Sequence, residues 1–146
     1  MKIKSPLRVR TYECDSYGHV NNAVYLNYLE YGRMDFLRGI DFDYDGIIKA
    51  GYYIYVTRID IHYKSSARFG DDLIVESFPI KLGAASGTFK QKIFKKADGT
   101  ICAQAEVTWA CVNKNSGQIS KLPNEFASSG LKPDPADFDE QTRNEN

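Results

Sequence analysis

The segment from Asn22 to about Arg38 constrains the fold of this chain more than any other. Apolar and small residues recur there at helical spacing, namely Tyr25, Tyr28, Leu29, Gly32 and Phe36. Other faces carry further apolar side chains, at Val24, Leu26 and Leu37. We therefore expect a helix that is buried on most of its circumference, which requires a sheet that wraps around it. A mid-helix glycine costs about 1 kcal/mol relative to alanine, so Gly32 indicates close packing against that sheet.

The ends of this helix have recognisable signals. Asn21 or Asn22 is a suitable N-cap, because an asparagine side chain can accept a hydrogen bond from the free amides of the first turn. Gly39 follows the last turn and is the expected residue after the helix.

The rest of the chain predicts strands. Residues 7–10 alternate apolar and basic side chains, which indicates a short first strand, and residues 41–53 form a connecting segment with acidic and glycine residues. In residues 54–64 the apolar side chains move from even to odd positions near Thr57, which predicts a bulge in the strand. A strand follows the turn at residues 70–71, and Asp98-Gly99 predicts a two-residue hairpin turn between two more. One helix followed mainly by strands indicates an α+β fold with a strongly curved, mainly antiparallel sheet.

Composition excludes several classes of protein. Lysine plus arginine equals aspartate plus glutamate at 19 each, so the basic excess that neutralises phosphates in a nucleic-acid binder is missing. No stretch reaches the roughly 18 apolar residues of a membrane span, and no signal-peptide pattern is present. The three cysteines form no C-x-x-C pair and are expected to be reduced thiols. We therefore expect a cytoplasmic protein with no nucleic-acid or membrane partner.

Most familiar catalytic arrangements are also missing. Two histidines, His19 and His62, are too few for a histidine-based metal site, so we predict no metal. The glycine motifs of nucleotide-binding loops and of the serine-hydrolase elbow are absent, and Ser16 with His19 lacks an orienting third residue. Cys14 lies between two acidic residues, whose charges make it a weak candidate for a thiolate nucleophile.

Asp15 and the start of the helix form the remaining candidate. The free N–H groups of a first helical turn carry partial positive charge and can stabilise a carbonyl oxygen that becomes negative. A carboxylate just upstream, across a turn that contains Gly18, can reach the same carbonyl carbon or a water beside it. The alternative is that Asp15 only closes an Asx-turn and that Asn21 or Asn22 only caps a helix. On spacing alone, this structural interpretation is favoured.

A longer pattern changes that balance. The run RTYECDSYGHVNNAVYL at residues 10–26, continued through residues 28–30 to Arg33, resembles the 4-hydroxybenzoyl-CoA thioesterase-like branch of the hotdog-fold superfamily. FGDDLIVES at residues 69–77 is similar to a later family segment, and the resemblance covers roughly residues 5–125. It implies five antiparallel strands wrapped around one long central helix, in a single domain at residues 1–130. Residues 131–146 are polar, proline-containing and net acidic, so their composition predicts a disordered tail.

The resemblance also implies an activity. Such proteins hydrolyse acyl-CoA thioesters to a carboxylic acid and CoA, require no metal or organic cofactor, and form homodimers or homotetramers with active sites at the subunit interface. By position, Asp15 matches the catalytic aspartate, acting as nucleophile or as general base, and the backbone N–H of Asn22 matches the group that polarises the thioester carbonyl. The expected substrate-binding residues are Gly18, His19 and Asn21 in the turn, Tyr25 in the channel, and Tyr53 and Tyr55 from the partner subunit. Glu30 and Arg33 are interpreted as a structural ion pair.

One difference from the family pattern leaves open whether the acyl group is carried by CoA or by another carrier. Where the founding type has basic residues for the CoA phosphates, this chain has a small-residue turn at residues 83–87. Phosphate contacts would then come from the partner subunit or from Lys64, Arg68, Lys81 or Lys90. An acyl-carrier-protein thioesterase is therefore an alternative. An enoyl-thioester hydratase that uses His19, and a non-catalytic acyl-thioester binding protein, are alternatives from other classes.

Overall fold

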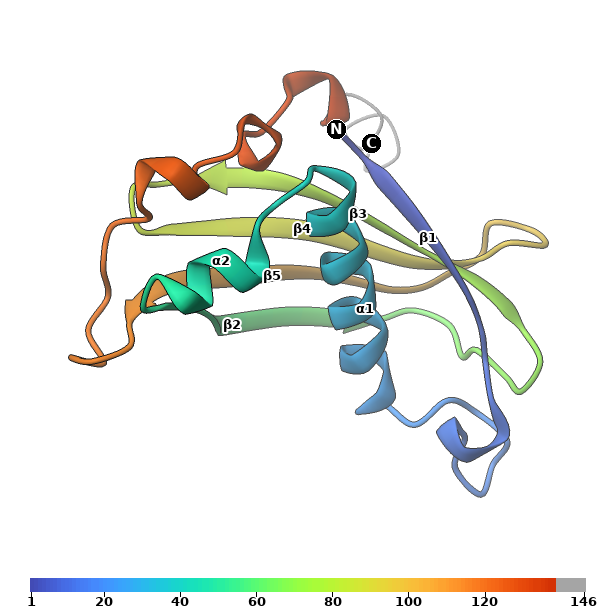
Figure 1. Ribbon diagram of the computed structural model, residues 1–146. Coiled ribbons are helices and arrows are strands. Elements are labelled where there is room, and N and C mark those ends of the chain that lie inside the picture. Colours follow the sequence, from blue (N-terminus) through green and yellow to red (C-terminus); the bar gives the residue numbers. More distant parts are fainter. Residues whose placement is uncertain (139–146) are drawn as a thin grey trace.

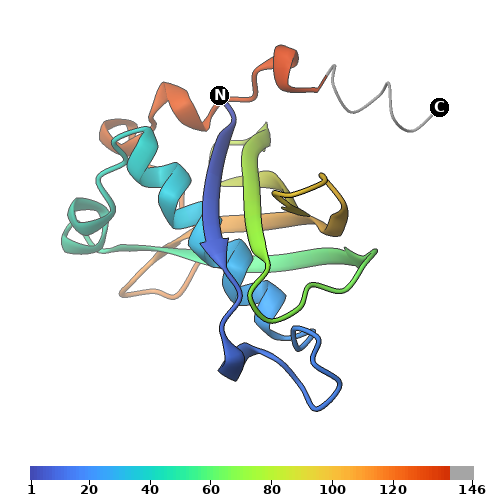
Figure 2. The ribbon, with the colours of Figure 1, turned by 90° about the vertical axis from the view of Figure 1, so that its right-hand side faces the viewer.

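The computed structural model describes residues 1–138, which form one antiparallel sheet and one long helix (Figure 1). The elements are β1 (Ile3–Arg8), α1 (Val24–Gly39), α2 (Tyr44–Lys49), β2 (Tyr52–Tyr63), β3 (Asp72–Leu82), β4 (Ser86–Lys95) and β5 (Ile101–Asn113). Within residues 1–138 the sheet has five strands in the order β1-β3-β4-β5-β2, so β1 and β2 are its edges. Figures 1 and 2 show the sheet curving around α1. This arrangement confirms the α+β architecture predicted from the sequence.

Helix α1 lies against the strands β1, β3 and β4. Its buried residues are the five that the helical spacing predicts, Tyr25, Tyr28, Leu29, Gly32 and Phe36. Apart from Gly32, they divide between two apolar clusters, one around Leu29 and Val75 and the other around Phe36 and Trp109. Gly32 is at the point of closest approach, because a Cβ atom there would lie 2.5 Å from Cγ1 of Val75.

The expectation that most of the α1 circumference is buried is wrong for the single chain. Leu26, Tyr31 and Met34 are each more than a third exposed. The sheet of one chain covers one side of the helix, and α1 hardly touches the edge strand β2. The flank of α1 that faces β2 is therefore open.

The predicted irregularity in the first long strand is confirmed. The pairing of β2 with β5 shifts between Val56 and Arg58, so Thr57 is the extra residue of a bulge. The hairpin between β4 and β5 also forms, but its connection is longer than the predicted two residues and runs from Lys96 to Thr100. The N–H of Gly99, which has a φ of 75°, donates to the Lys95 carbonyl and closes this longer turn.

Two local features near the end of α1 differ from expectation. Gly39 is the last helical residue, and Asp41, with a φ of 54°, has the left-handed conformation instead. The segment predicted as a connection contains the short helix α2, in which the Asp43 side chain accepts a hydrogen bond from the Gly46 N–H at 2.9 Å. A six-residue helix is too short for its apolar spacing to be recognised.

The chain after β5 packs on the domain as far as the structure describes it. Short 3₁₀ turns form at Asn124–Phe126, Ser129–Leu131 and Pro135–Asp137. Leu131 is buried, and the N-terminal amine lies 2.9 Å from a carboxylate oxygen of Asp137. The prediction of a disordered tail from residue 131 is therefore wrong for residues 131–138, and residues 139–146 lie outside the described chain. Among the helices of residues 1–138, none is long and apolar enough to cross a membrane.

Candidate active site

A tight turn before α1 carries Asp15. A bridge between Cys14 and Val20 closes the turn, inside which the Asp15 N–H donates to the His19 carbonyl at 2.8 Å. Gly18 has a φ of 78°, a conformation that L-residues with side chains rarely adopt. The turn is anchored to the loop between β2 and β3, because the Val20 N–H donates to the Ala67 carbonyl.

The carboxylate of Asp15 closes an Asx-turn. Its Oδ1 atom accepts from the backbone N–H groups of Tyr17 at 2.9 Å and His19 at 3.3 Å. Its Oδ2 atom accepts no hydrogen bond from residues 1–138, and the side chain is exposed. The predicted Asx-turn at Asp15 therefore forms, and it leaves one carboxylate oxygen available for chemistry.

The N-cap residue of α1 is Ala23, so the predicted N-cap at Asn21 or Asn22 is wrong, and Asn21 instead closes the turn before the helix. Its side-chain Oδ1 accepts from the Ala23 N–H and its carbonyl accepts from the Val24 N–H, both at 2.9 Å. The regular helix begins at Val24, two residues later than predicted. Within this turn, the backbone N–H of Asn22 makes no hydrogen bond with any other part of residues 1–138. An amide in this position adds to the positive end of the helix dipole.

Two tyrosines fix the first turn of the helix against the neighbouring loop. The Tyr25 hydroxyl accepts from the Ala67 N–H at 3.0 Å, and burial raises the pKa of Tyr25. The Tyr63 hydroxyl donates to the Asn22 carbonyl at 2.9 Å, and the two rings contact edge to face with centroids 5.4 Å apart. Sequence analysis did not assign Tyr63 to the site. After the Thr57 bulge, however, Tyr63 shares the face of the strand that carries Ile59 and Ile61, and this alternation could have placed it toward the helix.

These groups line one cleft of about 340 Å³. The predicted residues Asp15, His19, Asn22 and Tyr25 all border it, as do Tyr63 and Lys64. Gly18 and Asn21 shape the turns beside it without lining it. Of the four basic residues considered for phosphate contacts, Lys64 borders the cleft.

Tyr53 and Tyr55 are not part of this cleft in the single chain. Ile54 and Val56 point toward α1, so the alternation along β2 places the two tyrosines on the opposite face of the sheet. Their rings lie 5.6 Å apart, and the Lys114 ammonium lies 5.8 Å from the Tyr53 ring centroid. Their predicted role depends on a partner subunit and stays a prediction.

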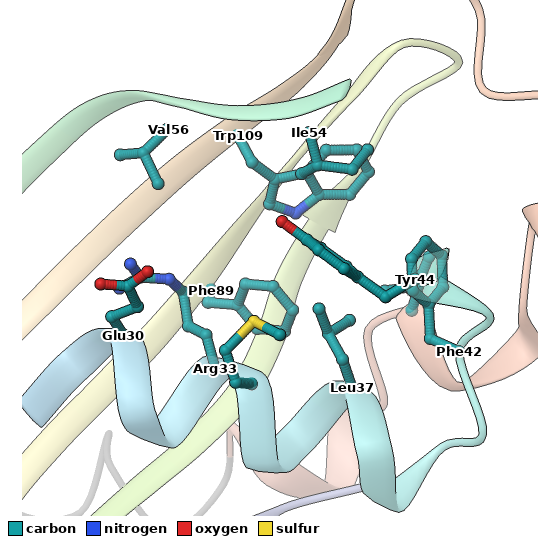
Figure 3. Close-up of a pocket in the computed structure, with 11 residues that line it drawn as sticks. Glu30, Arg33, Leu37, Phe42, Tyr44, Ile54, Val56, Phe89 and Trp109 are labelled. Carbon is teal, nitrogen blue, oxygen red and sulfur yellow. The ribbon is translucent and has the colours of Figure 1, made fainter. Parts of the chain in front are cut away.

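A second, mainly apolar pocket of about 110 Å³ lies between the open flank of α1 and the strands β2, β4 and β5 (Figure 3). Its wall includes Met34, Leu37, Ile54, Phe89 and Trp109, together with the charged residues Glu30 and Arg33. The predicted Glu30–Arg33 ion pair is wrong, since Glu30 acts on the guanidinium through its charge without an ion-pair contact among residues 1–138. Arg33 instead donates from Nη1 to Oε1 of Gln91 at 3.0 Å.

The remaining reactive side chains have ordinary structural roles. Cys14, Cys102 and Cys111 are free thiols, and burial raises the pKa of Cys102 and Cys111. His62 is an exposed strand residue whose Nε2 lies 3.0 Å from Oδ1 of Asp60. Within residues 1–138, no group of three or more histidine, cysteine, aspartate or glutamate side chains could hold a metal ion.

Comparison with known proteins assigns the family. The model of the thioesterase-like superfamily matches residues 9–129. The chain belongs to this superfamily. Within it, the long-chain acyl-CoA thioesterase FadM of Escherichia coli (strain K12) is 31% identical over 124 residues, which cover 85% of this chain and 93% of FadM. The chloroplastic acyl-acyl carrier protein thioesterase ATL3 of Arabidopsis thaliana is 37% identical over 89 residues, or 61% of this chain. That alignment covers 47% of ATL3, so the match spans about half of the plant protein.

Solved structures agree with the fold of this superfamily member. The 1,4-dihydroxy-2-naphthoyl-CoA thioesterase from Synechocystis superposes with a TM-score of 0.79 at 18% identity, covering 84% of this chain and 90% of that one. At this identity the likeness concerns the fold alone. It confirms the hotdog fold that the sequence predicted, with the curved five-stranded sheet around a central helix.

Proposed function

We propose that this protein is a thioester hydrolase that cleaves acyl-CoA into a carboxylic acid and CoA. The observation that carries the proposal is the cleft, where the Asp15 carboxylate and the Asn22 amide border the same space and both have unused hydrogen-bonding capacity. Membership of the thioesterase-like superfamily and the acyl-CoA thioesterase activity for which FadM is named support the reaction class.

In the proposed reaction, the thioester carbonyl oxygen accepts a hydrogen bond from the Asn22 N–H. Negative charge that develops on this oxygen is stabilised there, because the amide is fixed at the positive end of the helix. Oδ2 of Asp15 then acts in one of two ways. It attacks the carbonyl carbon and expels the CoA thiolate to form a mixed anhydride, which water hydrolyses to the acid and free Asp15. Alternatively, it takes a proton from the water that attacks the carbonyl carbon, and the C–S bond then breaks to release the CoA thiolate. In both routes a proton released from the water ends on the thiolate or in the solvent. Neither route requires a metal or an organic cofactor, since CoA is part of the substrate.

The other residues of the site hold this geometry. Gly18 and His19 shape the turn that presents Asp15, and Asn21 keeps the Asn22 amide at the helix start. Tyr25 borders the cleft from the helix, where the proposal places the pantetheine or acyl channel. Lys64, at the rim, is our candidate for a phosphate contact when the carrier is CoA.

We further propose a homodimer, with a homotetramer as its higher assembly, in which the open side of the chain is covered by a second copy. The edge of β2 is unpaired within residues 1–138, and Leu26 and Met34 on α1 are exposed. A two-fold axis beside β2 would pair this strand antiparallel with its copy. The role of Tyr53 and Tyr55 at a partner's site stays a proposal, because this pairing alone leaves both on the face of the sheet opposite α1. The proposed location remains the cytoplasm.

The carrier has a specific alternative. Because ATL3 is named for acyl-acyl carrier protein and is 37% identical over the aligned part, this carrier is the second candidate. The test is thiol release from one acyl group presented on CoA and on acyl carrier protein, repeated over short, long, branched and aromatic acyl groups. Faster turnover on CoA supports the leading proposal, and faster turnover on the protein carrier supports the alternative. Absence of thiol release from every substrate would refute both.

A further inference from the structure

The apolar pocket between α1 and β2 contains a guanidinium, that of Arg33, which has no ion-pair partner within 4.0 Å among residues 1–138. Arg33 is held there by Gln91, which is fully buried. Nε2 of Gln91 donates to the Leu29 carbonyl at 2.9 Å and to Oγ of Ser77 at 2.8 Å, so its Oε1 is left to accept from Arg33. This network leaves Gln91 little freedom and fixes the guanidinium in the pocket wall.

The guanidinium has more donors than partners. It carries five N–H groups, and within residues 1–138 its one hydrogen bond is the bond to Gln91. Within the same residues no carboxylate lies within 4.0 Å of it, although Glu30 stands beside it on the helix (Figure 3). Burial lowers the pKa of Arg33, which reflects the cost of taking this charge out of water. A partly buried cation with unused donors favours a ligand that brings an acceptor oxygen.

The rest of the pocket fits a hydrocarbon chain. Met34, Leu37, Ile54 and Phe89 provide apolar wall, and Figure 3 shows Arg33 and Glu30 together at one end with Trp109 farther along. A pocket with an apolar body and a few fixed polar groups orients its ligand through those groups. The nearby negative charge of Glu30 disfavours a second carboxylate and leaves a neutral oxygen as the better match.

We propose that this pocket binds an acyl chain with a hydroxyl or oxo oxygen beyond the thioester, and that Arg33 selects such chains. The inference rests on the proposed function and names its substrate class. In the proposed dimer, antiparallel pairing of β2 with its copy brings the Ile54 end of the strand in one chain toward the Tyr63 end in the other. The pocket of one chain then lies next to the partner's cleft, in the direction in which the acyl chain extends from the thioester carbonyl.

The first test measures kcat/KM for dodecanoyl-CoA and for its hydroxy and oxo analogues with the oxygen at carbon 3, in mid-chain and at the terminal carbon. We expect wild type to prefer at least one oxygenated substrate about 10-fold or more, the size of a hydrogen bond to a charged group. Arg33→Met should abolish the preference for the oxygenated chain. The matched control is Arg38→Met on the same helix, whose side chain is 83% exposed, and it should keep the preference.

The second test observes the pocket without relying on turnover. Trp109 is the single tryptophan of the chain and lines the pocket, so its emission reports occupancy. In an Asp15→Asn background, the preferred oxygenated acyl-CoA should change this emission at about 10-fold lower concentration than dodecanoyl-CoA. Ile54→Phe, which fills the pocket without touching Gln91, should remove the difference and serves if Arg33→Met does not fold.

The outcomes separate the two proposals. Equal kcat/KM for plain and oxygenated chains, or a preference that survives both pocket variants, overturns this inference and leaves the proposed hydrolase intact. Absence of hydrolysis of every thioester overturns the proposed function. In that case a selective response of Trp109 would still support the pocket, and an unselective one would refute it.

Discussion

Replacing Gly32 by alanine tests the close contact between α1 and the sheet. A Cβ atom at this position would lie 2.5 Å from Cγ1 of Val75, 3.0 Å from Oγ of Ser77 and 3.1 Å from Nε2 of Gln91. All three neighbours are buried, so we take the upper end of the usual overpacking cost, about 3 kcal/mol. Alanine recovers about 1 kcal/mol through its better helix propensity. The expected net loss in the free energy of unfolding is therefore about 2 kcal/mol.

Urea and thermal unfolding measure this difference directly. For a domain of this size we expect Tm to fall by about 6 °C. The control is Gly39→Ala in the same helix, where the added Cβ meets only the flexible end of the partly exposed Ile3 side chain. That variant should be unchanged or up to about 1 kcal/mol more stable. If Gly32→Ala is as stable as Gly39→Ala, the helix does not approach the sheet as closely as described.

Two further predictions concern buried groups. The Tyr28 hydroxyl is buried without a hydrogen-bond partner within residues 1–138, and burial followed by the nearby Glu13 carboxylate raises its pKa. Tyr28→Phe should therefore raise the free energy of unfolding, measured in urea, by about 1 kcal/mol. A decrease of that size would mean that the hydroxyl makes a hydrogen bond. In native protein at pH 8, a thiol reagent should modify Cys14 quickly and Cys102 and Cys111 slowly, because burial raises the pKa of the latter two. Three equally fast thiols, counted by mass spectrometry, would contradict this burial.

Periodic patterns in the sequence predicted most of the fold. The helical spacing identified the residues that α1 buries, and the change of parity identified the Thr57 bulge, because both reflect local backbone geometry. The same spacing could not say what covers the rest of the helix. Apolar character shows that Leu26 and Met34 favour burial, but whether the cover is the same chain or another copy depends on tertiary structure.

The candidate site was predicted in part for the same reason. Asp15, Asn21 and Asn22 lie within a few residues of each other, so their relative positions follow from two consecutive local turns. Tyr63 reaches the Asn22 carbonyl from 41 residues away, and Arg33 reaches Gln91 across 58 residues. Contacts at such separations depend on strand register, which local spacing does not reveal. The i, i+3 spacing of Glu30 and Arg33 therefore predicted the wrong partner for Arg33.

The most direct test of the account is Asp15→Asn, assayed by thiol release from acyl-CoA. Asparagine keeps an Oδ1 atom that can accept from the Tyr17 and His19 N–H groups, so the turn should persist while the negative charge is lost. Asp60→Asn, on the exposed strand β2, is the matched control for loss of one carboxylate. We predict that Asp15→Asn lowers kcat by at least about 100-fold with little change in Tm, while the control keeps full turnover. Undiminished turnover by a folded Asp15→Asn protein would contradict the account, because Asp15 would then only close the turn.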